Sequence, residues 1–438
     1  MFLIKKDQNF SIKIIFCLIY FFCWLSISTS FEDLKISSNN KLDLFDLLNF
    51  TRQFLIIISV IFLLGLSTKF FFEKKNIKLN SISLYIIFLI YLFLQIPGLI
   101  ISENNTDNIG FVLSSICAVL VLMMSEFYMD RVEKKIFLYI SVLFLSVIFI
   151  ISFIPDFIKY INGERTLYGN YSQSYLFLNK ISPRSSGLSR TILFLLILIN
   201  ILFNQKTNLR KYFFIFFKIS CVSIIILLQS RTIVFLTFLF LIFDFLSRKN
   251  YSPKILISEF VNFIIIPIMI IVLLNNLNFY FMQKKILKLE DSSIKYWSSK
   301  NFSKSIKATQ RPIDNFSSGR FEDWKQIVDE LDKRFIIGFG AQGDRFLINQ
   351  TASNGILYAL TSSGFIGLFF FIFFTLKIFF MALKNIFLAK FFENNEIFFN
   401  FLIITILMRS ILESSYAVFG IDLIILMTII NYFSKAIK

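Results

Sequence analysis

Long apolar runs alternate with short polar stretches along the whole chain. A helix needs about 20 apolar residues to cross the hydrocarbon of a bilayer, so each run of this length predicts a transmembrane helix. We therefore expect an all-α polytopic membrane protein, a single integral membrane domain over residues 1–438. About twelve spans are expected, and they begin near Phe10, Phe54, Ile82, Ile109, Ile136, Leu188, Tyr212, Thr232, Ile255, Ile356, Ile397 and Val418.

The connections between these runs differ in charge. Every second connection is basic, whereas residues 102–108 on the other side contain no Lys or Arg. Cytoplasmic loops carry an excess of Lys and Arg, so the basic series predicts twelve spans with both termini in the cytoplasm. The series includes Lys5, Lys6, Lys74, Lys75, Arg131, Lys134, Arg210, Lys211, Arg248, Lys249, Lys384, Lys390, Lys435 and Lys438.

The N-terminal run allows a second interpretation. Lys5 and Lys6 precede an apolar run that ends near the small residues Ser26, Ser28 and Ser30, as in a cleavable signal peptide. The run from 10 to 27 is longer than a usual signal core, which favours a retained helix. Cleavage would leave eleven spans.

Two outer connections are long, at residues 155–189 and 278–355. The second lies between spans nine and ten and contains an amphipathic pattern at about 319–334, with Trp324, Ile327 and Leu331 on one face. Function concentrates in long loops on a rigid scaffold, so we expect the site to involve this region.

Composition supports the membrane assignment and excludes several chemistries. Hydrophobic residues make up 56% of the chain, and the mean hydropathy is +0.71. The excess of 45 Lys and Arg over 28 Asp and Glu follows from the positive-inside bias, so we expect a lipid bilayer as partner and no nucleic acid. The chain has no histidine and four cysteines, all in apolar runs, so we expect no metal site, no cofactor, no disulfide framework and no imidazole-based catalysis.

Arginines recur where the outer loops meet the spans. Arginine stays charged and presents a planar fork that binds phosphate oxygens bidentately, so these residues are candidates for binding a diphosphate. They could instead snorkel to lipid headgroups or pair with carboxylates. Arg409 lies inside a span with Glu413 one turn later, and the two could pair on one helix face. The outer arginines are Arg184, Arg190, Arg231, Arg320, Arg345 and Arg409.

The order of these motifs resembles the O-antigen ligase and Wzy-type polymerase superfamily. The resembling segments are Pro183 to Arg190, Ser230 with Arg231, Ser318 to Arg320 with Trp324, the turn Gly338 to Gly340, Asn354 before a span, and Arg409 with Glu413. The resemblance covers the second half of the chain in residues and the whole chain in topology.

This resemblance implies a glycosyltransferase of the bacterial inner membrane whose active face is periplasmic. Its substrate would be a glycan carried on a polyprenyl diphosphate, and a chain-length regulator would be a further partner. Fixed cations can stabilise a departing diphosphate without a metal. We assign Arg184, Arg231 and Arg320 to the diphosphate, with Arg190 and Arg409 as second choices. The other candidates for substrate binding are Arg345, Glu413, Asn354 and Trp324.

The chain departs from the ligase pattern at one position. Ligases resembling this chain carry a histidine near the end of the late outer loop, where Ser353 and Asn354 stand here. The departure favours a polymerase that transfers glycan onto another lipid-linked repeat unit, with a ligase acting on lipid A core as the alternative. A carboxylate could then be the base, and the candidates are Glu164, Asp323, Asp344 and Glu413.

Two further functions stay open. Glu32 and Asp33 could supply the acidic motif of a polyprenyl-phosphate-dependent glycosyltransferase, although their loop is short. A lipid-linked oligosaccharide flippase would also have about twelve spans. A flippase should carry cations deep in several spans and no dominant outer loop. The spans here hold few charges, chiefly Lys218, Asp244, Glu259, Lys377, Arg409 and Glu413.

Overall fold

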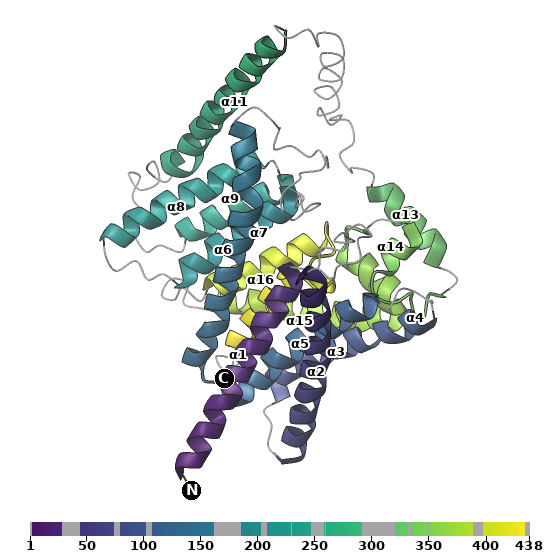
Figure 1. Ribbon diagram of the computed structural model, residues 1–438. Helices are drawn as coiled ribbons and strands as arrows, with labels where there is room; N and C mark the ends of the chain where they lie inside the picture. Colours follow the sequence, from purple (N-terminus) through teal and green to yellow (C-terminus); the bar gives the residue numbers. More distant parts are fainter. Residues whose placement is uncertain are drawn as a thin grey trace.

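The computed structural model describes residues 2–28, 44–73, 79–101, 107–161, 185–202, 208–228, 230–246, 258, 260–290, 320–331, 334–348, 351–388 and 397–433. Every regular element in these ranges is helical (Figure 1). The elements are α1 (Phe2–Ser28), α2 (Leu44–Glu73), α3 (Leu79–Phe93), α4 (Gln95–Ile101), α5 (Asp107–Tyr128), α6 (Arg131–Ile161), α7 (Ser185–Leu202), α8 (Asn208–Leu227), α9 (Arg231–Leu246), η1 (Val261–Ile265), α11 (Ile266–Glu290), α13 (Arg320–Leu331), α14 (Gly343–Ile348), α15 (Gly355–Leu388), α16 (Ile397–Ser410), η3 (Ser415–Ala417) and α17 (Ile421–Phe433).

The apolar runs form helices of two lengths. Within the described ranges, five helices are long and apolar enough to cross a bilayer, at 82–101, 108–128, 131–154, 261–281 and 355–387. Six shorter apolar helices account for further expected spans, at 11–27, 54–68, 186–202, 212–227, 397–410 and 421–432. The all-helical membrane class is thereby supported. The count of twelve spans and the cytoplasmic termini stay predictions.

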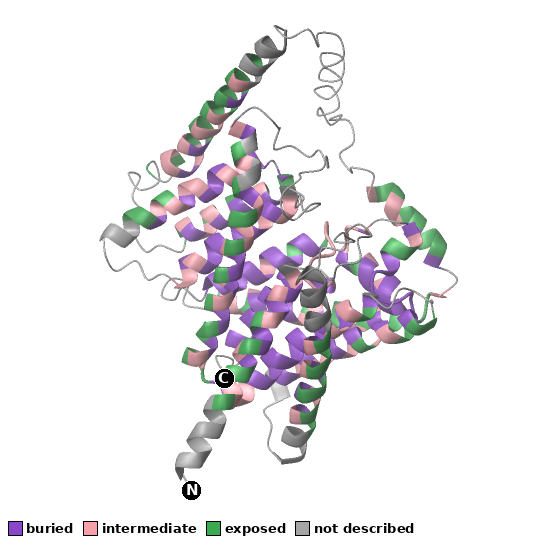
Figure 2. Ribbon diagram, in the orientation of Figure 1, coloured by how far each residue is buried: buried purple, intermediate pink, exposed green. Residues whose placement is uncertain are grey.

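The helices form a bundle whose centre is α5, α16 and α17. The side chains of α17 are buried from Leu423 to Tyr432, and buried residues are concentrated in the middle of the bundle (Figure 2). α5 packs against α1, α2 and α17, and α15 packs against α3 and α16. Peripheral helices keep large apolar side chains exposed, as Leu273 and Phe279 on α11 do, which is the pattern expected of a lipid-facing surface.

The segment before α14 fits into a break in α15. Gly364 has a φ of +65°, which interrupts the helix and frees carbonyls of the preceding turn. The amide of Phe339 donates to the Thr361 carbonyl at 2.7 Å, and the amide of Gly340 donates to the Ser362 carbonyl at 3.0 Å. The break in α15 therefore fixes the last part of the late loop.

Two helices extend beyond the points where the sequence predicts the long outer loops to begin. α6 continues to Ile161 and α11 to Glu290, so residues 155–161 and 278–290 are helical. The Asn278 side chain donates to the Tyr160 carbonyl at 2.6 Å, and the Tyr160 hydroxyl donates to the Asn275 side chain. These hydrogen bonds between α6 and α11 give polar residues of both helices a partner. The polarity pattern of the sequence does not reveal such partners.

Candidate functional site

Asp422 lies between two arginines from different helices. Its Oδ2 accepts a hydrogen bond from Arg409 on α16, and its Oδ1 lies 3.1 Å from Nη1 of Arg190 on α7. The hydroxyl of Ser415 also donates to Oδ2, at 2.6 Å. The side chains of Asp422 and Arg409 are only 1% and 4% exposed. Charges buried to this extent need partners, and this contact supplies them.

Glu413 extends this contact to the late loop. Its Oε2 lies 3.9 Å from Nη2 of Arg409, and its Oε1 lies 3.9 Å from Nη2 of Arg320 at the start of α13. Arg190, Arg320, Arg409, Glu413 and Asp422 are therefore one group, which we call the arginine cluster. Three cations face two anions in it.

The turn after α16 brings Asp422 to Nη1 and Glu413 to Nη2 of the Arg409 guanidinium. α16 ends at Ser410, and the chain reverses through residues 411–414 and η3 before α17 begins at Ile421. The amide of Leu412 donates to the Arg409 carbonyl at 3.1 Å, and the amide of Ala417 donates to the Ser414 carbonyl at 3.0 Å. This hydrogen-bonded turn holds an acidic residue on each side of the guanidinium.

The end of the late loop is tied to the same turn. Asn354 caps α15, because its Oδ1 accepts from the amides of Ile356 at 2.9 Å and Leu357 at 3.1 Å. Its Nδ2 donates to the carbonyl of Ile411 at 3.0 Å. The Trp324 indole donates to the Ala352 carbonyl at 2.7 Å. α13 and the start of α15 are thus fixed next to the arginine cluster.

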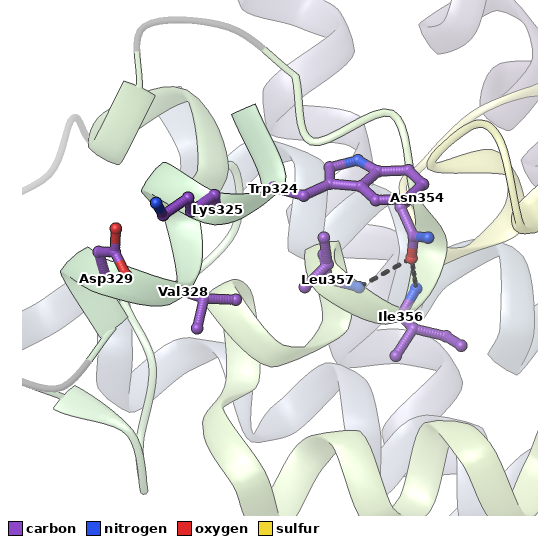
Figure 3. Close-up of a pocket in the computed structure, with 7 residues that line it drawn as sticks. All are labelled: Trp324, Lys325, Val328, Asp329, Asn354, Ile356 and Leu357. Carbon is purple, nitrogen blue, oxygen red and sulfur yellow. Dashed lines mark hydrogen bonds between the residues drawn. The ribbon is translucent and has the colours of Figure 1, made fainter. Parts of the chain in front are cut away.

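A surface groove of about 460 Å³ lies between α13 and the start of α15 (Figure 3). Its apolar lining comes from Trp324, Val328, Ile356 and Leu357. Its polar lining comes from Lys325, Asp329 and Asn354. The groove is open to the outside of the protein and begins one helical turn from Arg320.

Asp344 anchors α14 beneath this region, in the loop outside the membrane-spanning segments. Its two carboxylate oxygens accept from the amides of Ala352 at 2.7 Å and Arg345 at 2.9 Å. Burial raises the pKa of Asp344 above its ordinary value, and the two amide hydrogen bonds oppose that rise. Because its carboxylate already holds two backbone amides, its geometry is that of a structural residue.

The structure joins four of the sequence candidates and separates others from them. Arg190, Arg320, Arg409 and Glu413 meet in the arginine cluster, and Trp324 and Asn354 line the adjacent groove. Arg345 donates to the Gln342 side chain at 3.2 Å. Arg231 is exposed at the start of α9, and it forms none of the ion pairs that join the described residues of the cluster. Arg184, Glu164, Glu32 and Asp33 lie outside the described residues.

Asp422 is a residue of the cluster that the sequence pattern did not predict. The signal was present, because an acidic residue inside the last apolar run is costly in lipid and implies a buried partner. Its partner Arg409 precedes it by 13 residues and lies on another helix. The three- or four-residue spacing of pairs within one helix therefore does not reveal this pair. Glu413 was proposed as the partner of Arg409, and it is a second, longer contact.

Comparison with protein families gives one result for the second half of the chain. Residues 216–372 match the family model described as O-antigen ligase. The match includes Arg320 and Trp324 and ends before Arg409, and it covers less than half of the chain. Searches of curated proteins and of solved structures found no significant match. The resemblance to the O-antigen ligase and Wzy-type superfamily is therefore confirmed through residues 216–372, which match the O-antigen ligase family model.

Proposed function

We propose that this protein transfers a glycan from a polyprenyl diphosphate to an acceptor glycan at the periplasmic face of the bacterial inner membrane. The acceptor is another lipid-linked repeat unit, so the product is a longer polymer. The observation that carries the proposal is the arginine cluster, in which cations from α7, α13 and α16 converge beside the late loop. The family match at residues 216–372 supports the reaction class.

The proposed chemistry is a displacement at the anomeric carbon. An acceptor hydroxyl forms the new glycosidic bond as the bond between that carbon and the diphosphate oxygen breaks, and the electron pair stays on the diphosphate. Arg190 and Arg320, which are partly exposed, would bind the diphosphate, and the buried Arg409 would stabilise it through its charge, because fixed cations stabilise charge that develops on a leaving group. Asp422 would act as a positioning residue that holds Arg190 and Arg409.

Glu413 is the carboxylate we propose as acceptor of the hydroxyl proton. Its side chain is 24% exposed, whereas that of Asp422 is 1% exposed and already contacts two arginines and Ser415. Asp344 is buried with two backbone amides, and Asp323 lies in the first turn of α13, where an acid stabilises the helix start. Glu413 therefore combines access with proximity to the cations.

Arg231 and Arg184 retain the diphosphate role that the sequence predicts for them, as part of the same proposal. Arg231 begins α9 and is exposed, so its guanidinium is accessible to a substrate. The relation of Arg184 to the cluster lies outside the described residues. Arg345 is proposed to act from α14, where it contacts Gln342.

The test is a polymer-length ladder in cells that lack the gene and carry variants at matched expression. Arg320→Ala and Glu413→Gln should each abolish the ladder and leave a single repeat unit attached to lipid A. Gln326→Ala, an exposed residue on the same helix as Arg320 but outside both the cluster and the adjacent groove, should change it far less. A normal ladder with Arg320→Ala would contradict the proposed diphosphate site.

The same experiment separates the alternatives. A polymerase leaves one repeat unit on lipid A when the gene is deleted. Complete loss of attached glycan would indicate the ligase instead, or a flippase. Accumulated lipid-linked repeat units on the periplasmic side would then distinguish the ligase from the flippase.

A further inference from the structure

The Trp324 side chain lines the groove between α13 and α15 (Figure 3). Its only polar atom, the indole N–H, is used by the Ala352 carbonyl at 2.7 Å. The Phe321 ring packs edge-on against it, with ring centres 5.3 Å apart. A fixed indole with its donor satisfied can offer a ligand only its π-face.

Polar groups lie around this apolar surface. Val328, Ile356 and Leu357 continue the apolar lining, and Lys325 and Asp329 supply a cation and an anion. A pyranose ring has the complementary chemistry, with C–H groups on one face and hydroxyls around its edge. The volume of about 460 Å³ lies within the range of small-molecule sites.

We propose that this groove binds the sugar residue next to the diphosphate of the lipid-linked glycan, with its C–H face on Trp324 and its hydroxyls toward Lys325 and Asp329. This inference rests on the proposed function, because it takes the diphosphate to lie at the arginine cluster. It adds a glycan subsite and makes α13 the helix that contacts both the diphosphate and the sugar of the substrate.

The spacing along α13 matches that arrangement. Arg320 and Trp324 are four residues apart on one helix, so they lie about 6 Å apart along its axis and on neighbouring positions of one face. Arg320 contacts Glu413 within the cluster, while Trp324 lines the groove. A diphosphate at Arg320 therefore places the sugar bonded to it beside Trp324. A lipid chain or an apolar peptide would not explain the charged pair, Lys325 and Asp329, in the lining.

The test uses the full-length protein in lipid nanodiscs and three probes. The first is farnesyl diphosphate, which has no sugar. The second is the lipid-linked repeat unit purified from a strain lacking this protein. The third is the free oligosaccharide that mild acid releases from the second. Binding is measured for wild type, Trp324→Ala, Trp324→Phe, Arg320→Ala and the control Phe346→Ala, an exposed aromatic of α14 outside the groove.

Trp324→Ala should weaken binding of the repeat unit and of the free oligosaccharide by roughly tenfold, because the stacking surface for the sugar is lost. It should leave binding of farnesyl diphosphate unchanged, because that probe has no sugar. Trp324→Phe should restore most of the binding, and Phe346→Ala should have no effect. Arg320→Ala should weaken binding of the two probes that contain a diphosphate. It should leave binding of the free oligosaccharide unchanged.

Equal binding of the free oligosaccharide by wild type and Trp324→Ala would overturn the groove assignment. Failure of wild type to bind either diphosphate probe would overturn the proposed function instead. In that case the oligosaccharide alone decides whether the groove binds sugar. The two failures are thus distinguishable.

Discussion

Arg409 on α16 donates a hydrogen bond to Asp422 on α17 across the turn that joins the two helices. Both side chains are almost completely buried, and Arg190 approaches the other oxygen of the same carboxylate at 3.1 Å. The pair therefore links the core of the bundle to the region where the substrate is proposed to bind.

Replacing Asp422 should destabilise the protein and abolish transfer. Asp422→Ala leaves Arg409 buried without its main partner, and breaking a buried pair in this way costs about 3–5 kcal/mol. Asp422→Asn keeps the shape and should cost less stability, but it should still release Arg190 and Arg409. Thermal unfolding of purified protein and the polymer ladder measure the two effects. Glu322→Gln, an exposed acid on α13, is the matched control. Unchanged unfolding with Asp422→Ala would refute the pairing.

A second buried pair gives an independent prediction about stability. Lys218 Nζ on α8 lies 2.6 Å from Asp244 Oδ2 on α9, and Asn200 on α7 donates to the other oxygen at 3.3 Å. Lys218→Met alone should lower the unfolding temperature, because a buried carboxylate loses its cation. The double variant Lys218→Met with Asp244→Leu should recover most of the loss. Equal destabilisation by the single and double variants would show that the charges do not act as a pair.

The break in α15 predicts an effect of a single methyl group. Gly364 has a φ of +65°, and a Cβ there would collide with the carbonyl oxygen of Ile336. Gly364→Ala should therefore destabilise the protein by about 1–3 kcal/mol, or detach the segment around Ile336 and expose it to protease. Gly65→Ala has open space around its Cβ and should be neutral or slightly stabilising. Identical unfolding of both variants would contradict the conformation at Gly364.

Asp344 predicts a pH dependence of stability. Its pKa is raised in the folded protein, so its contribution is complete below the unfolded value of 3.8 and is lost as pH rises through the folded pKa. Asp344→Asn cannot titrate. The unfolding temperature of wild type relative to Asp344→Asn should therefore fall as pH rises from about 4 toward neutrality. Thermal unfolding across this range measures the difference, and an opposite slope would mean that the amide hydrogen bonds outweigh burial.

Arg231 tests an assignment that rests on the sequence. If Arg231 binds diphosphate, Arg231→Ala should shorten the polymer. It should also weaken binding of farnesyl diphosphate, as Arg320→Ala should. Arg231→Lys keeps the charge but loses the bidentate fork, so it should restore only part of the activity. Normal protein level with undiminished polymer length in Arg231→Ala would remove Arg231 from the site.

The sequence also predicted an amphipathic helix at about 319–334, and α13 lies within this range, from Arg320 to Leu331. This was possible because its acidic first turn and its face of Trp324, Ile327 and Leu331 are local features. The family resemblance also came from local motifs, and the match at residues 216–372 supports it. Helix ends were less predictable, because the partner of Asn278 is Tyr160 on a helix distant in sequence.

By itself, the sequence determined the all-helical membrane class and the resemblance to the O-antigen ligase and Wzy-type superfamily that the match at residues 216–372 supports. The length of the apolar runs and the placement of charges decide the membrane class, and both can be read directly from the sequence. Only the tertiary structure decided which arginines share carboxylates. Arg190, Arg320 and Arg409 lie on three helices, and their contacts with Asp422 and Glu413 arise when the bundle packs. Burying a charge is costly enough that packing must supply a partner, and no single-helix pattern shows where that partner lies.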